Sequence, residues 1–581
     1  MKHLVTLFLA LLLFMPARAQ MPAHPRLLEQ PHPLEADAPW YARRVDSTIA
    51  AFSREVLDLP PVERTFTGRR LLGVSREALK RIFWLSYTYR TRGGEQYARR
   101  AIEEMLSVSR FTDWNPSHFL DVGEMTMALA IGYDWLYAEM QADERRAVAE
   151  AILEKGLRPA LEPDNAWFYT TEINWNSVCN AGMVYGALAV WEEDSDFCAR
   201  MLEKSLESSK LAFNAYSPEG GFPEGYNYWG YGTSFQIMLE AAVAPFAEDR
   251  IPERFLRSAR FVQFMSSPGG RCFNFSDSYI DARFQYMQAW MAARTGDRSL
   301  LYPELRLLSG GAQAAEERLL PMFLLYLPPG ADADIPREHV YTCGGTTPVY
   351  IYREDWTSAG SDYLGIKGGL SMSSHSHMDQ GSFFFESGGV AWATDLGMQD
   401  YNSLESVGLD LWGMTQDSER WEVFRIGPWS HNIVTVNGNA PKVNHKADFS
   451  EIWADGARRG AALDLSALYD DDLASCTREV YLEGGTLHIV DALEAGEAPC
   501  RVRWAMCTEA SARIEGSAIV LEADGKTRVL RAPEDLEPHI WPVSYPGEHL
   551  HAYDVPNPGR SMVGFTCTLQ PLERRQLHLT L

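Results

Sequence analysis

The sequence is short of positive charge. Its 581 residues carry 78 acidic and 53 basic side chains, so the formal net charge is −25 at pH 7. Proteins that bind nucleic acid neutralise phosphates with lysine and arginine, and a strongly acidic chain repels polyanions. The composition therefore argues against a nucleic-acid partner. An anionic substrate would have to meet positive groups that are local to a cleft.

Cysteine is scarce and scattered. The 8 cysteines form no CxxC motif and no regular spacing. This is the pattern of neither a zinc cluster nor a disulfide scaffold. Pairing between isolated cysteines stays open.

Long apolar runs are missing beyond the N-terminus. The apolar run from Leu4 to Met15 follows Lys2, is too short to span a bilayer, and ends in an Ala-x-Ala cleavage motif at Ala17 and Ala19. We expect residues 1–19 to be a signal peptide and the mature protein to be exported, either to a periplasm or to the medium. No later run is long enough for an integral membrane segment.

The chain changes character near residue 330. Between residues 75 and 327, about ten segments repeat apolar residues every three to four positions, with proline or glycine between them, which predicts helices joined by short links. Segments such as 127–135 are apolar nearly all round, so we expect them to form the inner layer of a two-layer helical ring. A solenoid is the competing arrangement, although no fixed-period repeat is present.

A linker rich in proline and glycine follows at 328–336. After it, short β-rich runs alternate with turn residues, which predicts an antiparallel sandwich. The expected architecture is therefore an α + β multidomain protein, with the helices first and the sheets second.

The most informative segment contains His375, His377 and Asp379. We expect a strand here, on which alternate side chains share a face. A serine-glycine-glycine turn then predicts a hairpin that brings Asp395 back beside His377, and His431 follows further on. Two imidazoles and a carboxylate suit a zinc ion. The alternative is a hydrogen-bonded set of sheet histidines.

Two further motifs lie in the helical half. Asn174-Trp175-Asn176 opens a strongly apolar helix, and a loop at 223–232 carries Tyr228 and Tyr231. Loops at helix ends would line the mouth of a helical ring. Structural alternatives are a helix N-cap for Asn176 and simple packing for the aromatic loop.

Amides, phenols and imidazoles together supply the parts for β-elimination from a uronate. The C5 proton is α to a carboxylate, which must be neutralised or hydrogen-bonded as charge builds on it, and asparagine N–H groups can do this. A base takes the C5 proton and an acid protonates the departing glycosidic oxygen. Tuned tyrosine and histidine side chains can fill both roles.

Five motifs in this order resemble those of the heparinase II/III-like polysaccharide lyases. They are Asn-Trp-Asn, Pro-Glu-Gly-x-x-Tyr-Trp, His-x-His-x-Asp-x-Gly, Trp-x-x-Asp-x-Gly and Ser-His-Asn. The resemblance implies an (α/α) toroid over 20–330 and an antiparallel β-sandwich over 331–581. It also implies cleavage of a uronate-containing polysaccharide, either a glycosaminoglycan like heparin or heparan sulfate, or alginate, to 4,5-unsaturated ends.

The resemblance implies a role for each matching residue. Asn176, or Asn174 in its place, would meet the substrate carboxylate. Tyr228 and His375 would transfer protons, with Tyr231 in reserve and Tyr401 as a second phenol. The set His377, Asp395 and His431 would hold a divalent metal, which we expect to be zinc. Substrate contacts are expected from Trp175, Glu224 and Tyr231. Some family members carry a histidine beside the first-motif asparagine, where this chain has Ile173, Trp175 and Ser177, so the identity of the base stays open between His375 and Tyr228.

Two other functions compete with a lyase. A glycoside hydrolase with a helical toroid would need two carboxylates across the scissile bond, for which Glu224, Asp379 and Asp395 are candidates. A non-catalytic glycan-binding protein would keep the aromatic residues but would not need Tyr228 and His375 to converge. The polymer, endo or exo action and the oligomeric state stay open.

Overall fold

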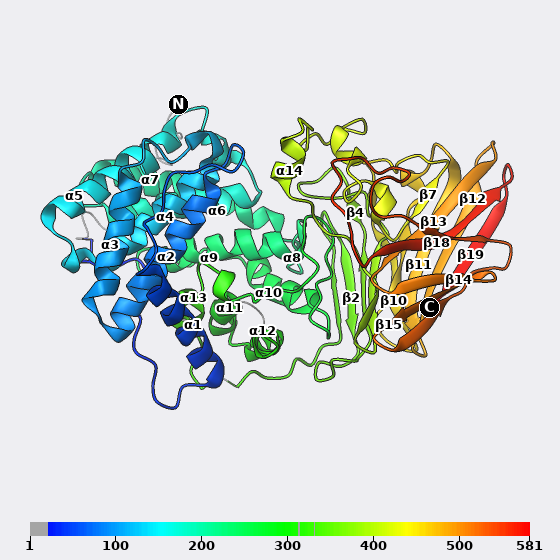
Figure 1. Cartoon of the computed structure of the whole chain (residues 1–581), viewed down its shortest axis with the longest axis horizontal. Helices are drawn as coiled ribbons and strands as arrows, with labels where there is room; N and C mark the ends of the chain where they lie inside the picture. Colours follow the sequence, from blue (N-terminus) through cyan, green and yellow to red (C-terminus); the bar gives the residue numbers. More distant parts are fainter. Residues whose placement is uncertain (1–20, 312–313, 331) are drawn as a thin grey trace, which may run out of the picture.

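The computed structural model describes residues 21–311, 314–330 and 332–581. A helical N-terminal part is followed by a C-terminal part of antiparallel sheets, as the sequence predicts (Figure 1). The helices end with α13 (Pro321–Leu325) and the strands begin with β1 (Val340–Cys343), so the predicted boundary at 330 falls between them. The expected signal peptide lies outside the described residues. Within the described ranges, no helix is long and apolar enough to cross a membrane.

The helical part follows the predicted pattern closely. Its helices are α1 (Trp40–Val56), α2 (Leu72–Arg92), α3 (Glu95–Ser109), α4 (Phe119–Trp135), α5 (Ala142–Ala151), α6 (Asn174–Ala189), α7 (Ser195–Ser208), α8 (Gly225–Tyr228), α9 (Ser234–Val243), α10 (Glu253–Met265), α11 (Gln288–Thr295), α12 (Tyr302–Ser309) and α13. The first of these, α1, lies before the predicted segments. It is amphipathic and buries one face, as a helix on the outside of the bundle does.

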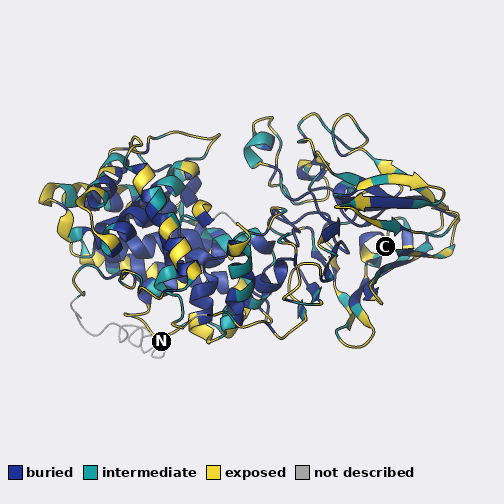
Figure 2. Ribbon diagram, turned by 60° about the horizontal axis from the view of Figure 1, so that its bottom comes forward, coloured by how far each residue is buried: buried dark blue, intermediate teal, exposed yellow. Residues whose placement is uncertain are grey.

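An inner layer of helices is buried almost completely. Every residue of α4 is buried, as are nearly all of α6 and α9, and Figure 2 shows buried helices in the interior of the helical part. The α4 and α6 helices come so close that a Cβ on Gly182 would lie 2.3 Å from the carbonyl oxygen of Gly123. Glycine at both positions permits this approach, which packs the N-terminal part of α4 against the middle of α6.

The sheet part contains three larger antiparallel sheets and two small ones. Their orders are β1-β2-β3-β5-β6, β19-β12-β11-β10-β9, β17-β18-β13-β7, β14-β15-β16 and β4-β8. The strands are β1, β2 (Val349–Arg353), β3 (Tyr363–Lys367), β4 (Gly369–Leu370), β5 (Phe383–Ser387), β6 (Val390–Ala393), β7 (Val434–Val436), β8 (Lys446–Ala447), β9 (Phe449–Trp453), β10 (Arg458–Asp464), β11 (Leu473–Glu483), β12 (Thr486–Ala495), β13 (Cys500–Thr508), β14 (Ser511–Glu515), β15 (Ala518–Ala523), β16 (Lys526–Leu530), β17 (Glu537–Trp541), β18 (Ser561–Leu569) and β19 (Arg574–Thr580). One core, which includes Phe383, Ile489 and Trp504, joins the three larger sheets.

The histidine segment is a loop, so the strand predicted there is wrong. It connects β4 to β5, and His375 has a φ of 59°. The serine-rich run before His375 offers few residues that favour strands, and a left-handed residue interrupts any ladder. Asp379 does not share a face with the histidines but pairs with the buried amine of Lys367. The predicted β5–β6 hairpin is present and returns the chain to Asp395.

All 8 cysteines lie in the described part of the chain and are free. Seven of them are buried, and only Cys567 is half-buried. They pack as small apolar side chains, which agrees with the absence of a disulfide pattern in the sequence.

Candidate active site

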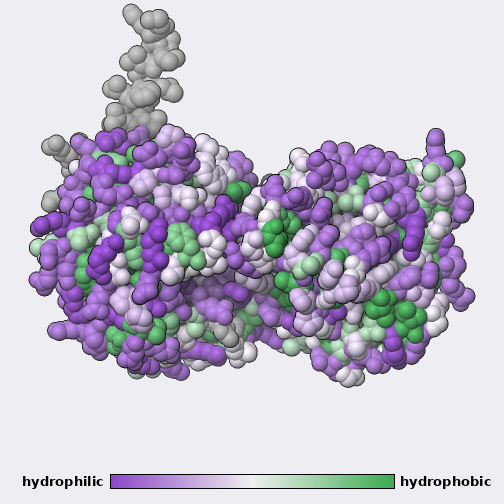
Figure 3. Space-filling view, turned by 45° about the horizontal axis from the view of Figure 1, so that its top comes forward, coloured by the Kyte–Doolittle hydropathy of each residue, from purple (hydrophilic) through white to green (hydrophobic). Residues whose placement is uncertain are grey.

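A cavity of about 660 Å³ lies where the helical part meets the sheet part. Figure 3 shows the surface hollowed between the two parts. Its walls come from the N-terminal ends of α4 and α6, from the segment around α8, and from the loops at 374–375 and 398–412 of the sheet part. Both parts of the chain are therefore needed to form it.

Tyr228 and His375 meet in this cavity. Their rings stack with centroids 3.8 Å apart and an interplanar angle of 21°. Tyr228 ends α8 in the helical part, and His375 lies in the loop before β5. A lyase needs these two residues to converge, and the packing of the two parts brings them together.

Asp277 connects the two histidines. Its Oδ2 accepts a hydrogen bond from His375 Nδ1 at 2.8 Å, and its Oδ1 accepts one from His377 Nε2 at 3.0 Å. Burial alone would raise the pKa of Asp277, but the hydrogen bonds from both imidazoles hold it well below its ordinary range. No sequence motif marks Asp277, which lies in an irregular loop between α10 and α11.

A chain of hydroxyl groups extends from Asp277 to Tyr228. The Tyr401 hydroxyl donates to Asp277 Oδ2 at 2.7 Å and lies 3.0 Å from His375 Nδ1. The oxygen atoms of Tyr228 and Tyr401 are 2.7 Å apart, so Tyr401 accepts the hydrogen bond of Tyr228. Burial, reinforced by the charge of Asp277, raises the pKa of both phenols well above 10. Tyr228 is therefore a neutral phenol at neutral pH.

Of the two candidate asparagines, only Asn174 reaches the cavity. It begins α6 and lines the cavity wall, and its side-chain oxygen has no partner among the described residues. The expectation that Asn176 faces the substrate is wrong. Asn176 is fully buried, and its amide donates to Phe168 O at 3.0 Å and to Ser208 Oγ at 2.9 Å. It ties α6 to the segments at 166–170 and 195–208 instead.

The three predicted substrate contacts take different positions. The substrate contact predicted for Glu224 is wrong. Its side chain is buried behind the cavity near Ser374, where burial raises its pKa. Tyr231 lines the cavity. Trp175 is half-buried at the cavity wall and packs edge-on against His118 with ring centroids 4.9 Å apart. His118, which the sequence analysis does not single out, also lines the cavity, and its Nδ1 bonds Asp121 Oδ1 at 2.6 Å.

His377, Asp395 and His431 form a possible metal site. One ligand atom from each residue lies within 4.8 Å of the other two, and all three residues are buried. Two of their nitrogen atoms, His377 Nδ1 and His431 Nε2, are buried without a hydrogen-bond partner in the described structure. Orphaned imidazole nitrogens beside a carboxylate are the donor set that a divalent cation satisfies. The residues therefore fit a divalent cation.

The C-terminal part also matches a known protein family. Residues 355–563 match the heparinase II/III-like C-terminal family, a range that includes His375, His377, Asp395, Tyr401 and His431. The chain carries a heparinase II/III-like domain. No curated protein matches the sequence.

Several solved polysaccharide lyases, which are carbon–oxygen lyases, resemble the whole chain. A heparinase III structure has a TM-score of 0.62 at 13% identity, covering 87% of this chain and 76% of that chain. The heparan sulfate lyase HepC from Pedobacter heparinus has a TM-score of 0.58 at 13% identity, with coverage of 93% and 86%. A Paenibacillus xanthan lyase has a TM-score of 0.52 at 11% identity, with coverage of 94% and 57%. These similarities establish a shared fold of helices followed by antiparallel sheets.

Arginines surround the cavity next to the heparinase-like domain, despite the acidic composition of the chain. Buried Glu124 bonds Arg76 at 3.1 Å, Arg318 at 2.5 Å and the Tyr231 hydroxyl at 2.8 Å. Arg69, Arg70 and Arg283 also line the cavity. The positive groups that an anionic substrate needs are thus local to the cleft.

Proposed function

We propose that the protein cleaves a uronate-containing polysaccharide by β-elimination and leaves a 4,5-unsaturated uronate end. The observation that carries this proposal is the stack of Tyr228 on His375, held by Asp277 in an arginine-lined cavity. An imidazole and a neutral phenol side by side supply a base and an acid for one sugar ring.

His375 is the base in this proposal. Asp277 accepts a hydrogen bond from Nδ1, which fixes the proton on that nitrogen and leaves Nε2 with a lone pair. Nε2 has no partner within the described ranges of the chain. It takes the C5 proton, and the carboxylate of Asp277 stabilises the imidazolium that forms.

Tyr228 is the acid. Its raised pKa keeps it protonated until the glycosidic bond breaks, when it gives its proton to the leaving oxygen. The Tyr401 hydroxyl lies 2.7 Å from Tyr228 and 3.0 Å from His375 Nδ1. After the products leave, the imidazolium releases its Nε2 proton to solvent and the Tyr228 phenolate takes up a proton, which restores both groups.

Asn174 meets the substrate carboxylate. Its side chain lines the cavity, and the close approach of Gly232, where a Cβ would lie 3.2 Å from Asn174 Cβ, holds it beside the Tyr228 segment. A neutral donor that hydrogen-bonds the carboxylate stabilises the charge that develops as the proton leaves.

The metal held by His377, Asp395 and His431 is zinc in this proposal. When bound, zinc would add positive charge behind Asp277 and fix the orientation of His377. Asp277 already accepts from His377 Nε2, as a carboxylate commonly does from a metal-binding histidine.

The wider setting is also part of the proposal. The helices form an (α/α) toroid, the sheets form a sandwich, and the protein is exported to a periplasm or to the medium. The substrate is a glycosaminoglycan of the heparin or heparan sulfate kind, or alginate. The hydrolase alternative is disfavoured because its candidates Glu224, Asp379 and Asp395 do not line the cavity.

A spectroscopic assay tests the proposal. A lyase releases products that absorb in the ultraviolet through the new double bond, whereas a hydrolase releases only reducing ends. Incubation with a panel of uronate polymers should give absorbing products from at least one of them. A panel that gives reducing ends without absorbance would overturn the elimination mechanism.

A further inference from the structure

A second polar face lies on the sheet β17-β18-β13-β7, away from the cleft. Along β13, Val502 and Trp504 point into the core, so Arg501 and Arg503 lie on the opposite face. Arg503 is directly opposite Thr435 of β7 and Thr566 of β18. Strand alternation and register thus place two arginines and two threonines together.

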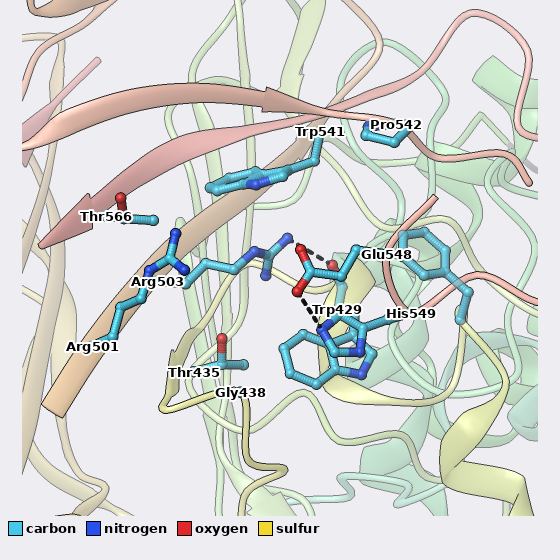
Figure 4. A pocket seen from close by; sticks show the side chains of 11 residues that line it. Trp429, Thr435, Gly438, Arg501, Arg503, Trp541, Pro542, Glu548, His549 and Thr566 are labelled. Atoms are coloured by element: carbon cyan, nitrogen blue, oxygen red, sulfur yellow. Dashed lines mark hydrogen bonds and ion pairs between the residues drawn. The ribbon is translucent and has the colours of Figure 1, made fainter. Parts of the chain in front are cut away.

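A cavity of about 90 Å³ covers this face. Figure 4 shows Arg503 between the indole rings of Trp541 and Trp429. The Arg503 guanidinium carbon is 4.3 Å from the Trp541 ring centroid and 5.9 Å from that of Trp429. The lining shares no residue with the cavity between the two parts of the chain. This is therefore a separate site.

The cavity contains polar atoms without partners. Arg503 Nη2 donates to the carbonyl oxygen of Trp429 at 3.2 Å, but Arg503 Nη1 is enclosed and has no acceptor in the described structure. The Thr435 hydroxyl is also enclosed and without a partner there, at 1% exposure. Arg501 is exposed at the rim and makes no side-chain ion pair with any described residue. Unsatisfied buried donors cost free energy unless a bound group accepts from them.

The aromatic rings are already in use, which limits what the cavity can hold. Trp429 stacks on His549 with ring centroids 3.5 Å apart and an angle of 2°, and Trp541 faces Arg503. A sugar ring therefore has no free aromatic face to stack on. The volume suits a group of a few heavy atoms.

Charge decides the kind of group. Burial lowers the pKa of Arg503 to about 10, so the guanidinium stays charged at neutral pH. Among the described residues that line the cavity, Glu548 carries the one carboxylate, and it is an exposed rim residue 3.5 Å from His549 Nε2. Two arginines therefore face one exposed counter-charge.

We propose that this cavity binds one oxyanion group, a sulfate or a carboxylate, carried by a saccharide chain outside the cleft. Arg503 and Arg501 bind its charge, and the Thr435 hydroxyl donates the remaining hydrogen bond. The saccharide as carrier rests on the proposed function; the oxyanion chemistry rests on the cavity alone. Such a site would hold a distant part of the polymer while the cleft works on another.

Calorimetric titration tests this site without turnover if every protein carries Tyr228→Phe. The probes are sodium sulfate, a sulfated heparin oligosaccharide and an unsulfated alginate oligosaccharide, all at constant ionic strength. Arg501→Ala and Arg503→Gln should weaken the site that binds sulfate by about tenfold or more, because each removes a charge-assisted hydrogen bond. Glu548→Gln should strengthen it. Arg574→Ala, which removes an 80% exposed arginine elsewhere on the sheets, should change nothing.

Each outcome has a defined meaning. Arginine-dependent binding of the sulfated oligosaccharide alone identifies sulfate as the bound group, and equal binding of both oligosaccharides shows that a carboxylate suffices. Binding of free sulfate without either oligosaccharide overturns the saccharide carrier. Arg501→Ala changes an exposed residue at the rim and leaves the core intact. If this variant binds all three probes as tightly as the protein that keeps Arg501, the proposed site is wrong. Arginine-dependent sulfate binding, together with a wild-type protein that cleaves no polymer, would remove the proposed function and leave the site standing.

Discussion

The ring of Tyr228 stacks on the ring of His375 with 3.8 Å between centroids, although α8 and the loop before β5 belong to different parts of the chain. Docking of the sheets against the helices therefore assembles the site. Any change that separates the two parts should abolish activity even when each part stays folded.

Tyr228→Phe should stop elimination without unfolding the protein. The variant keeps the ring that stacks on His375 and removes only the proton donor, so turnover should fall on the order of 10²- to 10⁴-fold. The matched control is Tyr231→Phe, which loses a hydrogen bond to Glu124 in the same cavity and should retain most activity. Steady-state rates for both variants, with thermal melting as a folding check, decide the matter. If the two variants turn over substrate at equal rates, Tyr228 is not the general acid.

Asn174 and Asn176 should respond differently to alanine. Asn174→Ala should lower turnover on the order of 10²-fold, as loss of an oxyanion donor does, and leave stability nearly unchanged. Asn176→Ala should instead lower the free energy of unfolding by about 1–3 kcal/mol, because Phe168 and Ser208 lose a buried donor. Denaturant unfolding and turnover measured on both variants separate the two effects. A stable, inactive Asn176→Ala variant would contradict this assignment.

Asp277 should give a pH-dependent contribution to stability. Its folded pKa is depressed below the unfolded value of about 3.9, so the ionised carboxylate stabilises the fold above about pH 4 and that contribution is lost as the pH falls further. Asp277→Asn should be less stable than wild type at pH 7, and the difference should shrink below about pH 4. Unfolding curves at both pH values measure it. A difference that grows on acidification would contradict the assignment.

Metal content should depend on the buried cluster. His377→Ala and His431→Ala should each lose the divalent ion that the wild type retains after purification in metal-replete buffer, because each removes one of three ligands. His488→Ala, a half-buried histidine on β12, is the control and should retain it. Elemental analysis gives the answer. If the wild type and all three variants contain equally little metal, the cluster binds no ion and is only a set of hydrogen-bonded side chains.

The stack also predicts which uronates are cleaved. An acid and a base side by side approach the same face of a sugar ring, which fits substrates whose C5 proton and C4 oxygen lie on one face. Glucuronate and mannuronate have this arrangement, whereas their C5 epimers iduronate and guluronate do not. Rates on matched oligosaccharides should favour the first pair by on the order of 10²-fold, the cost of misplaced reacting groups. Faster cleavage of iduronate or guluronate would instead indicate that the acid and the base approach opposite faces of the sugar ring.

Local patterns predicted much of this site, and the geometry between elements decided the rest. The glycine turn after β5 correctly returned Asp395 to His377 and His431. The choice between Asn174 and Asn176 failed because the helix begins at Asn174, and a residue two positions later lies about 200° further round the helix and faces inward. Asp277 could not be found from the sequence, because its partners lie 98 and 100 positions away.

The most direct test of the account is the ultraviolet absorbance of products from wild type, Tyr228→Phe and His375→Ala on a panel of uronate polymers. We expect absorbing products from the wild type on at least one polymer and on the order of 10²-fold or greater loss in both variants. Wild-type cleavage without absorbing products, or variants as fast as the wild type, would contradict it.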